Sequence, residues 1–174
     1  MKLKVLTGQQ LIDEGLEDEL IKFDRVNMES ILAEAGIVFP EEKRRTGLRS
    51  NPTFIMAFDG PAIVGYIEYL RSWNDADYIY VGSVQIAEKF RGSQLLIDLL
   101  DRLSSMLELE EFLGLEANVQ KVNAVAVRLY RKIGFELKQN PANEASLTAK
   151  AGKELLTDSP IAKLIQRRRR AKTR

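Results

Sequence analysis

The sequence contains no cysteine and no histidine among its 174 residues. Without cysteine the chain can form no disulfide, no thiolate metal site and no acyl-cysteine intermediate. Without histidine it lacks the commonest general base and the commonest zinc ligand, which also excludes every serine–histidine arrangement. We therefore expect no bound metal, and any proton transfer must use carboxylates, tyrosine, lysine or water.

Long hydrophobic runs are also missing. The longest stretch without a charged residue has ten residues, 78–87, and is too short to cross a bilayer. The first residues, MKLKVLTGQQLIDEG, contain no apolar segment of the kind found in signal peptides. The sequence therefore predicts a cytoplasmic protein with no membrane association.

The net charge of +1 conceals an uneven distribution. The last nine residues, QRRRRAKTR, carry six basic side chains, and the remaining 165 carry 20 basic and 25 acidic ones. The body thus offers no broad basic surface for nucleic acid. The tail, Arg167–Arg174, has two interpretations: a solvated helix end, or an electrostatic contact with nucleic acid or an acidic partner. We favour the first, and no aromatic residue is interleaved for stacking on bases.

The spacing of apolar residues predicts a mixed sheet with helices on its faces. Strands are expected at 2–6, 54–58, 62–70, 78–86, 113–119, 135–138 and 144–149. Helices are expected on both sides of Gly15, the second ending near Gly36, and at about 93–107, at 123–133 and after Pro160, where Ile161, Leu164 and Ile165 form an apolar stripe. The charged segment 39–52 is interpreted as a long loop or a broken helix.

The junction between the strand at 78–86 and the following helix is the first segment that suggests chemistry. The strand ends near Ile86, a basic turn contains Arg91 and Gly92, and the helix opens at about Ser93. A helix N-terminus presents unpaired N–H groups and a partial positive charge, which suit a phosphate or pyrophosphate. On this segment alone an ordinary helix start is the favoured interpretation, because many helices begin after an Arg-Gly turn.

The second such segment is NAVAVRLYRKIGF, residues 123–135. Its residues Ala126, Leu129, Tyr130 and Ile133 are three or four apart and share one helical face. Spacing alone favours a helix that packs on the core, with the tyrosine hydroxyl at its rim.

Taken together, these segments resemble the GNAT superfamily of N-acetyltransferases. The pattern Asn123-x-x-Ala126-x-x-Leu129-Tyr130-x-x-x-Gly134-Phe135 matches the family's motif around its second cofactor helix. Residues 84–86 and 90–92 are similar to its fourth strand and pyrophosphate turn, and residues 115–118 to its fifth strand. The resemblance covers roughly residues 1–150 and is specific over 80–135.

The resemblance implies an α/β (α+β) fold with a mixed, mostly antiparallel sheet of six to seven strands flanked by helices. It assigns residues 1–152 to an acetyltransferase-like domain and 153–174 to a helical extension with a basic tail. The implied activity is transfer of the acetyl group of acetyl-CoA to a primary amine, by direct attack in a ternary complex.

The resemblance also implies site residues. The pantetheine arm would pair with the backbone of Val84, Gln85 and Ile86, and the pyrophosphate would bind the turn formed by Arg91, Gly92, Ser93, Gln94, Leu95 and Leu96. Gln94 and Leu96 stand where the family's turn has small residues. Asn123 would contact the pantetheine arm, and Tyr130 would protonate the departing thiolate.

The general base is left open. Glu68 on the third strand and Glu116 on the fifth are candidates, water is another, and Tyr80 stands where some family members carry a glutamate. The altered glycines and the absence of an obvious base also admit a catalytically inactive GNAT-fold module that uses its surface and basic tail. Lys43-Arg44-Arg45 lies in the family's variable acceptor-binding region, where it either meets an acidic acceptor or is simply exposed. The sequence specifies neither the acceptor nor the oligomeric state.

Overall fold

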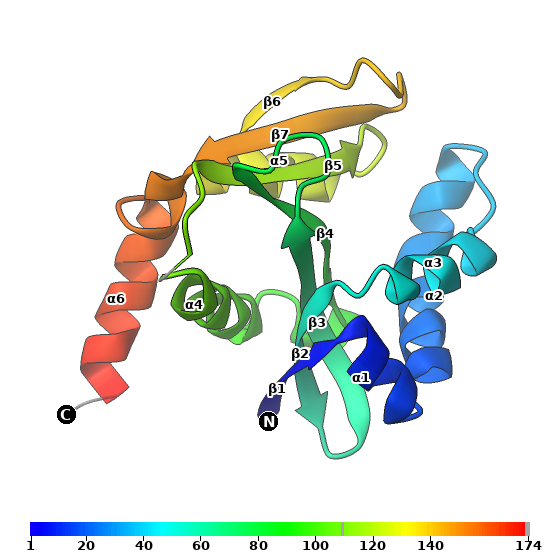
Figure 1. Cartoon of the computed structure of the whole chain (residues 1–174), viewed down its shortest axis with the longest axis horizontal. Coiled ribbons are helices and arrows are strands. Elements are labelled where there is room, and N and C mark those ends of the chain that lie inside the picture. The colour runs from blue at the N-terminus through cyan, green and yellow to red at the C-terminus, as the bar shows by residue number, and fades with distance from the viewer. Residues whose placement is uncertain (109, 173–174) are drawn as a thin grey trace. The chain divides into compact units, whose positions relative to one another are not determined.

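The computed structural model describes residues 1–108 and 110–172, without the side chains of Arg168 and Lys172 (Figure 1). Its strands are β1 (Lys2–Thr7), β2 (Thr53–Asp59), β3 (Ala62–Arg71), β4 (Tyr78–Ile86), β5 (Gly114–Gln120), β6 (Glu136–Gln139) and β7 (Ser146–Gly152). Its α-helices are α1 (Gly8–Asp13), α2 (Glu17–Glu34), α3 (Glu41–Arg49), α4 (Leu95–Leu107), α5 (Ala124–Ile133) and α6 (Pro160–Lys172). Two short 3-10 helices are η1 (Glu88–Phe90) and η2 (Lys153–Leu156).

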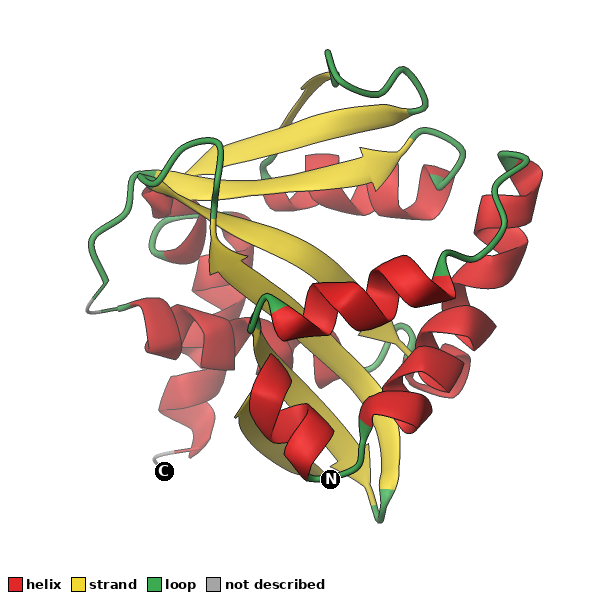
Figure 2. Ribbon diagram, turned by 45° about the vertical axis from the view of Figure 1, so that its right-hand side comes forward, coloured by secondary structure: helices red, strands yellow, loops and turns green. Residues whose placement is uncertain are grey.

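The strands form a seven-stranded sheet in the order β1-β2-β3-β4-β5-β7-β6. Antiparallel pairs join β1 to β2, β2 to β3, β5 to β7 and β6 to β7. The parallel pair is β4 with β5, where Tyr78–Tyr80 lie beside Gly114–Glu116. The mixed, mostly antiparallel sheet flanked by helices is therefore confirmed (Figure 2).

The chain divides into two compact units, each described by itself. Unit 1 comprises residues 1–70 and 83–99, and unit 2 comprises residues 71–82 and 100–174. The chain passes from one unit to the other within β3, β4 and α4.

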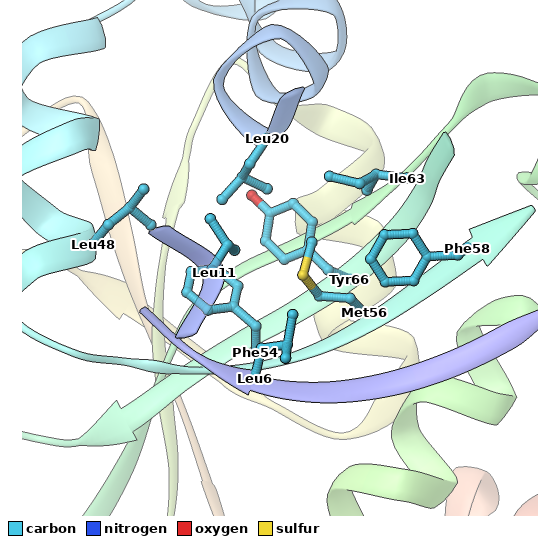
Figure 3. Close-up of a cluster of buried hydrophobic side chains, with 9 residues drawn as sticks. All are labelled: Leu6, Leu11, Leu20, Leu48, Phe54, Met56, Phe58, Ile63 and Tyr66. Atoms are coloured by element: carbon cyan, nitrogen blue, oxygen red, sulfur yellow. The ribbon is translucent and has the colours of Figure 1, made fainter. Parts of the chain in front are cut away.

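In unit 1 the first three helices cover one face of β1, β2 and β3, and their apolar side chains meet in one cluster (Figure 3). Burial of side chains of this size stabilises a fold by about 1.5–3 kcal/mol each. The cluster consists of Leu6, Leu11, Leu20, Leu48, Phe54, Met56, Phe58, Ile63 and Tyr66.

The segment interpreted as a loop or broken helix contains α3, a regular helix bounded by Pro40 and Pro52. Its sequence, EEKRRTGLR, has a single large apolar residue, Leu48, which is fully buried. A helix of this length is not stable alone in water, so tertiary contacts must hold it. Local sequence could not reveal those contacts.

In unit 2 local capping groups define the helix ends. Asn123 caps α5, because its Oδ1 accepts the N–H of Ala126 at 3.0 Å, and Gly134 ends the helix at φ 110°. Ser159 caps α6 in the same way, accepting the N–H of Ala162 at 3.0 Å. The apolar stripe predicted on α6 is wrong in one position, because Leu164 is 50% exposed and Ala162 is buried instead.

The basic tail is partly attached to unit 2. The Nε of Arg169 donates to Asp101 Oδ1 on α4 at 2.5 Å, and its Nη2 donates to Ser105 Oγ at 2.7 Å. The predicted contact region, 167–174, also includes the side chains of Arg168 and Lys172 and residues 173–174. These lie outside the described part of the chain. Among the described residues, none of the helices is long and apolar enough to span a membrane.

The packing of α1 against the end of α3 makes Gly8 a sensitive position. A Cβ at Gly8 would lie 2.1 Å from the carbonyl oxygen of Leu48 and 3.1 Å from Pro52 Cδ. Gly8→Ala should therefore lower the free energy of unfolding in urea by about 1–3 kcal/mol. Gly47→Ala is the matched control, because a Cβ there meets nothing within 4 Å and alanine favours a helix by about 0.5–1 kcal/mol. Equal effects of the two substitutions would contradict this packing.

Candidate functional site

The C-terminal half of β4 is incompletely covered. Ile79 and Val81 are buried, whereas the four residues that end the strand, 83–86, are each half-buried. The predicted strand at 78–86 is confirmed, and in its first half buried Ile79 and Val81 alternate with half-buried Tyr78 and Tyr80. The side chains at this strand end therefore keep part of their surface exposed.

Two local features shape the turn between β4 and α4: the backbone conformation of Gly92 and the hydrogen bonds of Ser93. Gly92 adopts φ +75°, a backbone conformation that side chains other than hydrogen disfavour. Ser93 Oγ accepts the N–H of Leu95 at 3.2 Å and donates to the carbonyl of Phe90 at 2.6 Å. Gln94 is exposed, Leu96 is half-buried, and Leu95 is fully buried in the core. The turn thus presents the first amides of α4 at the end of the half-covered strand.

Arg91 is fixed by contacts that the sequence did not predict. Its Nη2 donates to Asn27 Oδ1 on α2 at 3.0 Å, and its Nε donates to the carbonyl of Ile86 at 3.2 Å. Asn27 is itself buried and donates to the carbonyl of Phe23 at 2.9 Å. A guanidinium has five N–H groups, so donors remain for an anion. Nothing in the local sequence marks Asn27 as a partner of this turn.

A buried polar network occupies unit 1 beside the apolar cluster. The guanidinium of Arg44 on α3 lies between two carboxylates, with Nε 2.6 Å from Asp24 Oδ2 and Nη1 2.7 Å from Glu68 Oε2. Its Nη2 donates to the hydroxyl of Tyr66 at 3.2 Å. The Arg44 side chain is only 17% exposed. Both sequence interpretations of Arg44, an acceptor contact and simple exposure, therefore overlooked its structural partners.

The network continues to β4 through Tyr66, which is fully buried. The hydroxyl of Tyr66 donates to Asp24 Oδ1 on one side and lies 3.2 Å from Ser83 Oγ on the other. Gln85 Nε2 donates to the same Ser83 oxygen at 3.2 Å. A chain of hydrogen bonds thus joins α2 to the half-covered end of β4.

Burial controls the titration of this network. It raises the pKa of Asp24 and of Glu68, while the charge of Arg44 opposes the rise in each. Burial also places the pKa of Tyr66 well above its usual value. For Arg44 burial acts in the opposite direction, but the attraction of Tyr66, Glu68 and Asp24 prevails and raises its pKa. The guanidinium stays charged, and two carboxylates share this one cation.

Glu116 and Tyr80 belong to unit 2. Glu116 is buried, accepts a hydrogen bond from the hydroxyl of Ser72, and lies 3.3 Å from Lys150 Nζ. The hydroxyl of Tyr80 accepts from Asn118 Nδ2 at 3.4 Å, and its ring lies 5.0 Å from that of Trp73. The carboxylate predicted as a possible base is therefore already paired with a cation.

Tyr130 lies on α5 in the same unit and is half-buried. Its ring meets Phe135 edge to face at 5.0 Å. Burial raises the pKa of Tyr130 to about 12, with a smaller contribution from Tyr80. Within the part of the chain that is described, its hydroxyl has no hydrogen-bond partner. The phenol thus keeps its proton over the physiological range and can donate it to a ligand.

The structure places the sequence-predicted residues in two sets. Glu68, residues 84–86 and the turn 91–96 lie in unit 1, whereas Glu116, Asn123 and Tyr130 lie in unit 2. Residues that the sequence did not single out, Asp24, Tyr66 and Ser83, connect Glu68 to the strand end through Arg44. In the described residues no group of histidine, cysteine or carboxylate side chains is placed to hold a metal ion.

Comparisons with known proteins identify a family and a shared fold. Residues 20–135 match the family model described as "Acetyltransferase (GNAT) family". An acetyltransferase from Thermus thermophilus is similar in structure, with a TM-score of 0.66, 18% sequence identity and coverage of 87% of this chain and 97% of that one. No curated protein matches the chain in sequence.

Two further solved structures are similar. The PaiA N-acetyltransferase of Thermoplasma acidophilum, in complex with coenzyme A, has a TM-score of 0.64 and 16% identity over 87% of this chain and 99% of its own. The ribosomal-protein-S18-alanine N-acetyltransferase of Escherichia coli has a TM-score of 0.61 and 11% identity over 87% of this chain and 94% of its own. At these identities the likeness shows a shared fold.

The buried network yields a prediction about stability and pH. Arg44→Met leaves two buried carboxylates without a cation and should cost about 3–5 kcal/mol of unfolding free energy at pH 8. Because burial already raises both carboxyl pKa values, the folded state binds protons more readily than the unfolded state. Acid therefore relieves the loss, and the penalty should be smaller at pH 5 than at pH 8.

Urea unfolding at the two pH values checks this prediction. Arg45→Met is the matched control, because the carboxylates that pair with the neighbouring Arg45 include the 88% exposed Asp18 and the partly exposed Glu17 and Glu41, which water can solvate when the cation is removed. Its penalty should be much smaller. An Arg44→Met penalty that is the same at pH 5 and pH 8 would argue against the shared-cation network.

Proposed function

This chain belongs to the acetyltransferase (GNAT) family, and on that premise we propose that it transfers the acetyl group of acetyl-CoA to a primary amine. The observation that carries the proposal is the junction of β4 and α4. A half-covered strand end, a glycine turn and a capped helix start follow one another within the matched residues. Strand backbone suits an amide-containing arm, and helix amides suit a pyrophosphate.

The cofactor would lie along this junction. The backbone of Val84–Ile86 would pair with the pantetheine arm, and the amides of 91–96 with the pyrophosphate. Gln94 stands where the family's turn has a small residue, and it is exposed. This supports a turn in which its larger side chain does not crowd the pyrophosphate. Arg91 would add charge from a guanidinium that Asn27 and the carbonyl of Ile86 already orient. The Thermoplasma neighbour, solved with coenzyme A, supports the same class of ligand.

The reaction would be direct attack of the amine on the thioester, since the chain has no cysteine to carry the acetyl group. Backbone N–H groups of β4 would polarise the carbonyl. Tyr130 would protonate the coenzyme A thiolate as charge develops on sulfur, because its pKa of about 12 keeps the phenol protonated during turnover. Asn123 would contact the pantetheine arm through the amide nitrogen that helix capping leaves unused.

Calorimetry with acetyl-CoA tests the binding site. Arg91→Glu places a negative charge beside the pyrophosphate and should weaken binding at least tenfold, or about 1.4 kcal/mol. Lys89→Glu makes the same charge change on an exposed side chain of η1, near Asp59, and should weaken binding much less. Equal loss in both variants would mean that net charge, and not the turn, governs affinity. Wild-type protein without measurable affinity would favour the inactive module.

Turnover tests the role of Tyr130. Tyr130→Phe keeps the ring against Phe135 and should lower kcat by roughly 10²-fold, with little change in KM for acetyl-CoA. Tyr78→Phe is the matched control, since Tyr78 is a half-buried tyrosine of the same unit whose ring lies over Lys150 Nζ. The rate of thiol release, with an amine that the wild type acetylates as the acceptor, is measured for both variants. Full kcat in Tyr130→Phe would show that another group protonates the sulfur.

A further inference from the structure

The proposed reaction leaves one proton without a destination. A primary amine is mostly protonated at neutral pH and must lose a proton before its lone pair can attack. The sequence candidates for this task are both engaged by cations, Glu68 by Arg44 and Glu116 by Lys150. The hydrogen bonds that lead from Ser83 through Tyr66 to Asp24 offer another route for this proton.

The direction of that chain follows from the number of protons available. Tyr66 has one hydroxyl proton, and an ionised Asp24 can only accept. The Tyr66 proton is thus directed to Asp24, so the Ser83 hydroxyl must donate to the Tyr66 oxygen across their 3.2 Å separation. Gln85 donates to Ser83 from the surface side. All the donors point inward, from β4 toward the carboxylate on α2.

The carboxylate end of this series of hydrogen bonds can take up one proton. Asp24 and Glu68 carry two negative charges when ionised, and Arg44 supplies one positive charge. The titratable or charged groups that face Asp24 are Tyr66 and Glu68 on β3 and Arg44 on α3. Two buried carboxylates that share one cation titrate as a coupled group, and one of them takes up a proton more readily than an exposed carboxylate.

Ser83, at the other end of this series of hydrogen bonds, lies where the proposed function places the reaction. Ser83 immediately precedes Val84–Ile86, the backbone assigned to the pantetheine arm, and Ser83 and Gln85 share one face of β4 because strand side chains alternate. Both side chains are half-buried. Ser83 Oγ accepts from Gln85 and retains one acceptor position for a ligand N–H.

We propose that Ser83 and Tyr66 form a relay that carries the proton of the acceptor ammonium to the carboxylate of Asp24. This inference rests on the proposed acetyl transfer. In the step, an N–H bond of the ammonium breaks and its proton binds Ser83 Oγ. The Ser83 proton moves to Tyr66 Oη, and the Tyr66 proton moves to Asp24 Oδ1. The products are a neutral amine and a protonated Asp24, so one proton has moved and no redox partner is needed.

Arg44 and Glu68 act as positioning residues in this scheme. Arg44 orients the accepting carboxylate, because its Nε contacts Asp24 while its Nη1 is held by Glu68. Its contact with the Tyr66 hydroxyl fixes the middle of the relay. Asp24 is chosen over Glu68 because it is the carboxylate to which the Tyr66 hydroxyl donates.

The relay predicts a dependence on acceptor basicity. Ser83→Ala and Tyr66→Phe each interrupt the chain, so kcat with n-butylamine at pH 7 should fall by roughly 10²-fold. The loss should shrink as pH rises, because more amine is then already neutral. With methoxyamine, a weakly basic amine that is unprotonated at pH 7, the loss should be several-fold smaller.

Tyr69→Phe is the matched control. Tyr69 is a buried tyrosine on the same strand, three residues from Tyr66 and therefore on the opposite face. Its pH profile should equal that of the wild type. Ser83 is half-buried, so Ser83→Ala should keep the melting temperature and the calorimetric affinity for acetyl-CoA even where Tyr66→Phe is destabilised.

The outcomes separate the two proposals. Suppose that the wild type acetylates n-butylamine, and that Ser83→Ala and Tyr66→Phe have the same pH profile as the wild type and the same ratio of butylamine to methoxyamine turnover. The relay is then wrong and the acetyl transfer stands. If wild type releases no thiol with either amine or with a panel of alaninamide, lysine and ethylenediamine, the proposed function is wrong and the relay falls with it. A steeper pH profile confined to the two relay variants supports both.

Discussion

The placement of one guanidinium between two buried carboxylates organises unit 1. Arg44 joins α3 to Asp24 on α2 and to Glu68 on β3, and Leu48, one turn later on the same helix face, enters the apolar cluster. These two residues attach an otherwise polar helix to the sheet. Removing the cation alone would leave unpaired buried charge, which costs far more than the intact pair contributes. The fold therefore depends on the three side chains being present together.

The same helices prepare the end of β4. Asp24 and Asn27 lie three residues apart on α2, on one face, and both are buried. Asp24 reaches Ser83 through Tyr66, and Asn27 holds Arg91 beside the carbonyl of Ile86. One helix thus fixes both a polar side chain on the strand and the basic turn after it. In the proposed acetyl transfer, this arrangement would orient the group that meets the acceptor and the group that meets the pyrophosphate.

The sequence predicted the features that depend on local patterns. The boundaries of β4 and the end of α5 before Gly134 were readable, because apolar alternation and the backbone freedom of glycine act within a few residues. Helix α3 was not, since its charged residues have the pattern of a surface loop and its stability comes from partners on α2 and β3. Of the candidate site, Glu68 was predicted as a possible base, and that role stays a prediction. Its link to Ser83 was not predicted, because Asp24 and Tyr66 are 42 residues apart in the sequence.

The central claim is that this chain moves an acetyl group from sulfur to nitrogen. The most direct measurement supplies acetyl-CoA labelled with ¹³C in the acetyl group, together with a primary amine, and follows the label by mass spectrometry. We expect the labelled acetyl group to appear in an amide, in amounts equal to the free coenzyme A thiol that is formed. Label recovered only as acetate, or only as unreacted acetyl-CoA under conditions where the cofactor is bound, would contradict it.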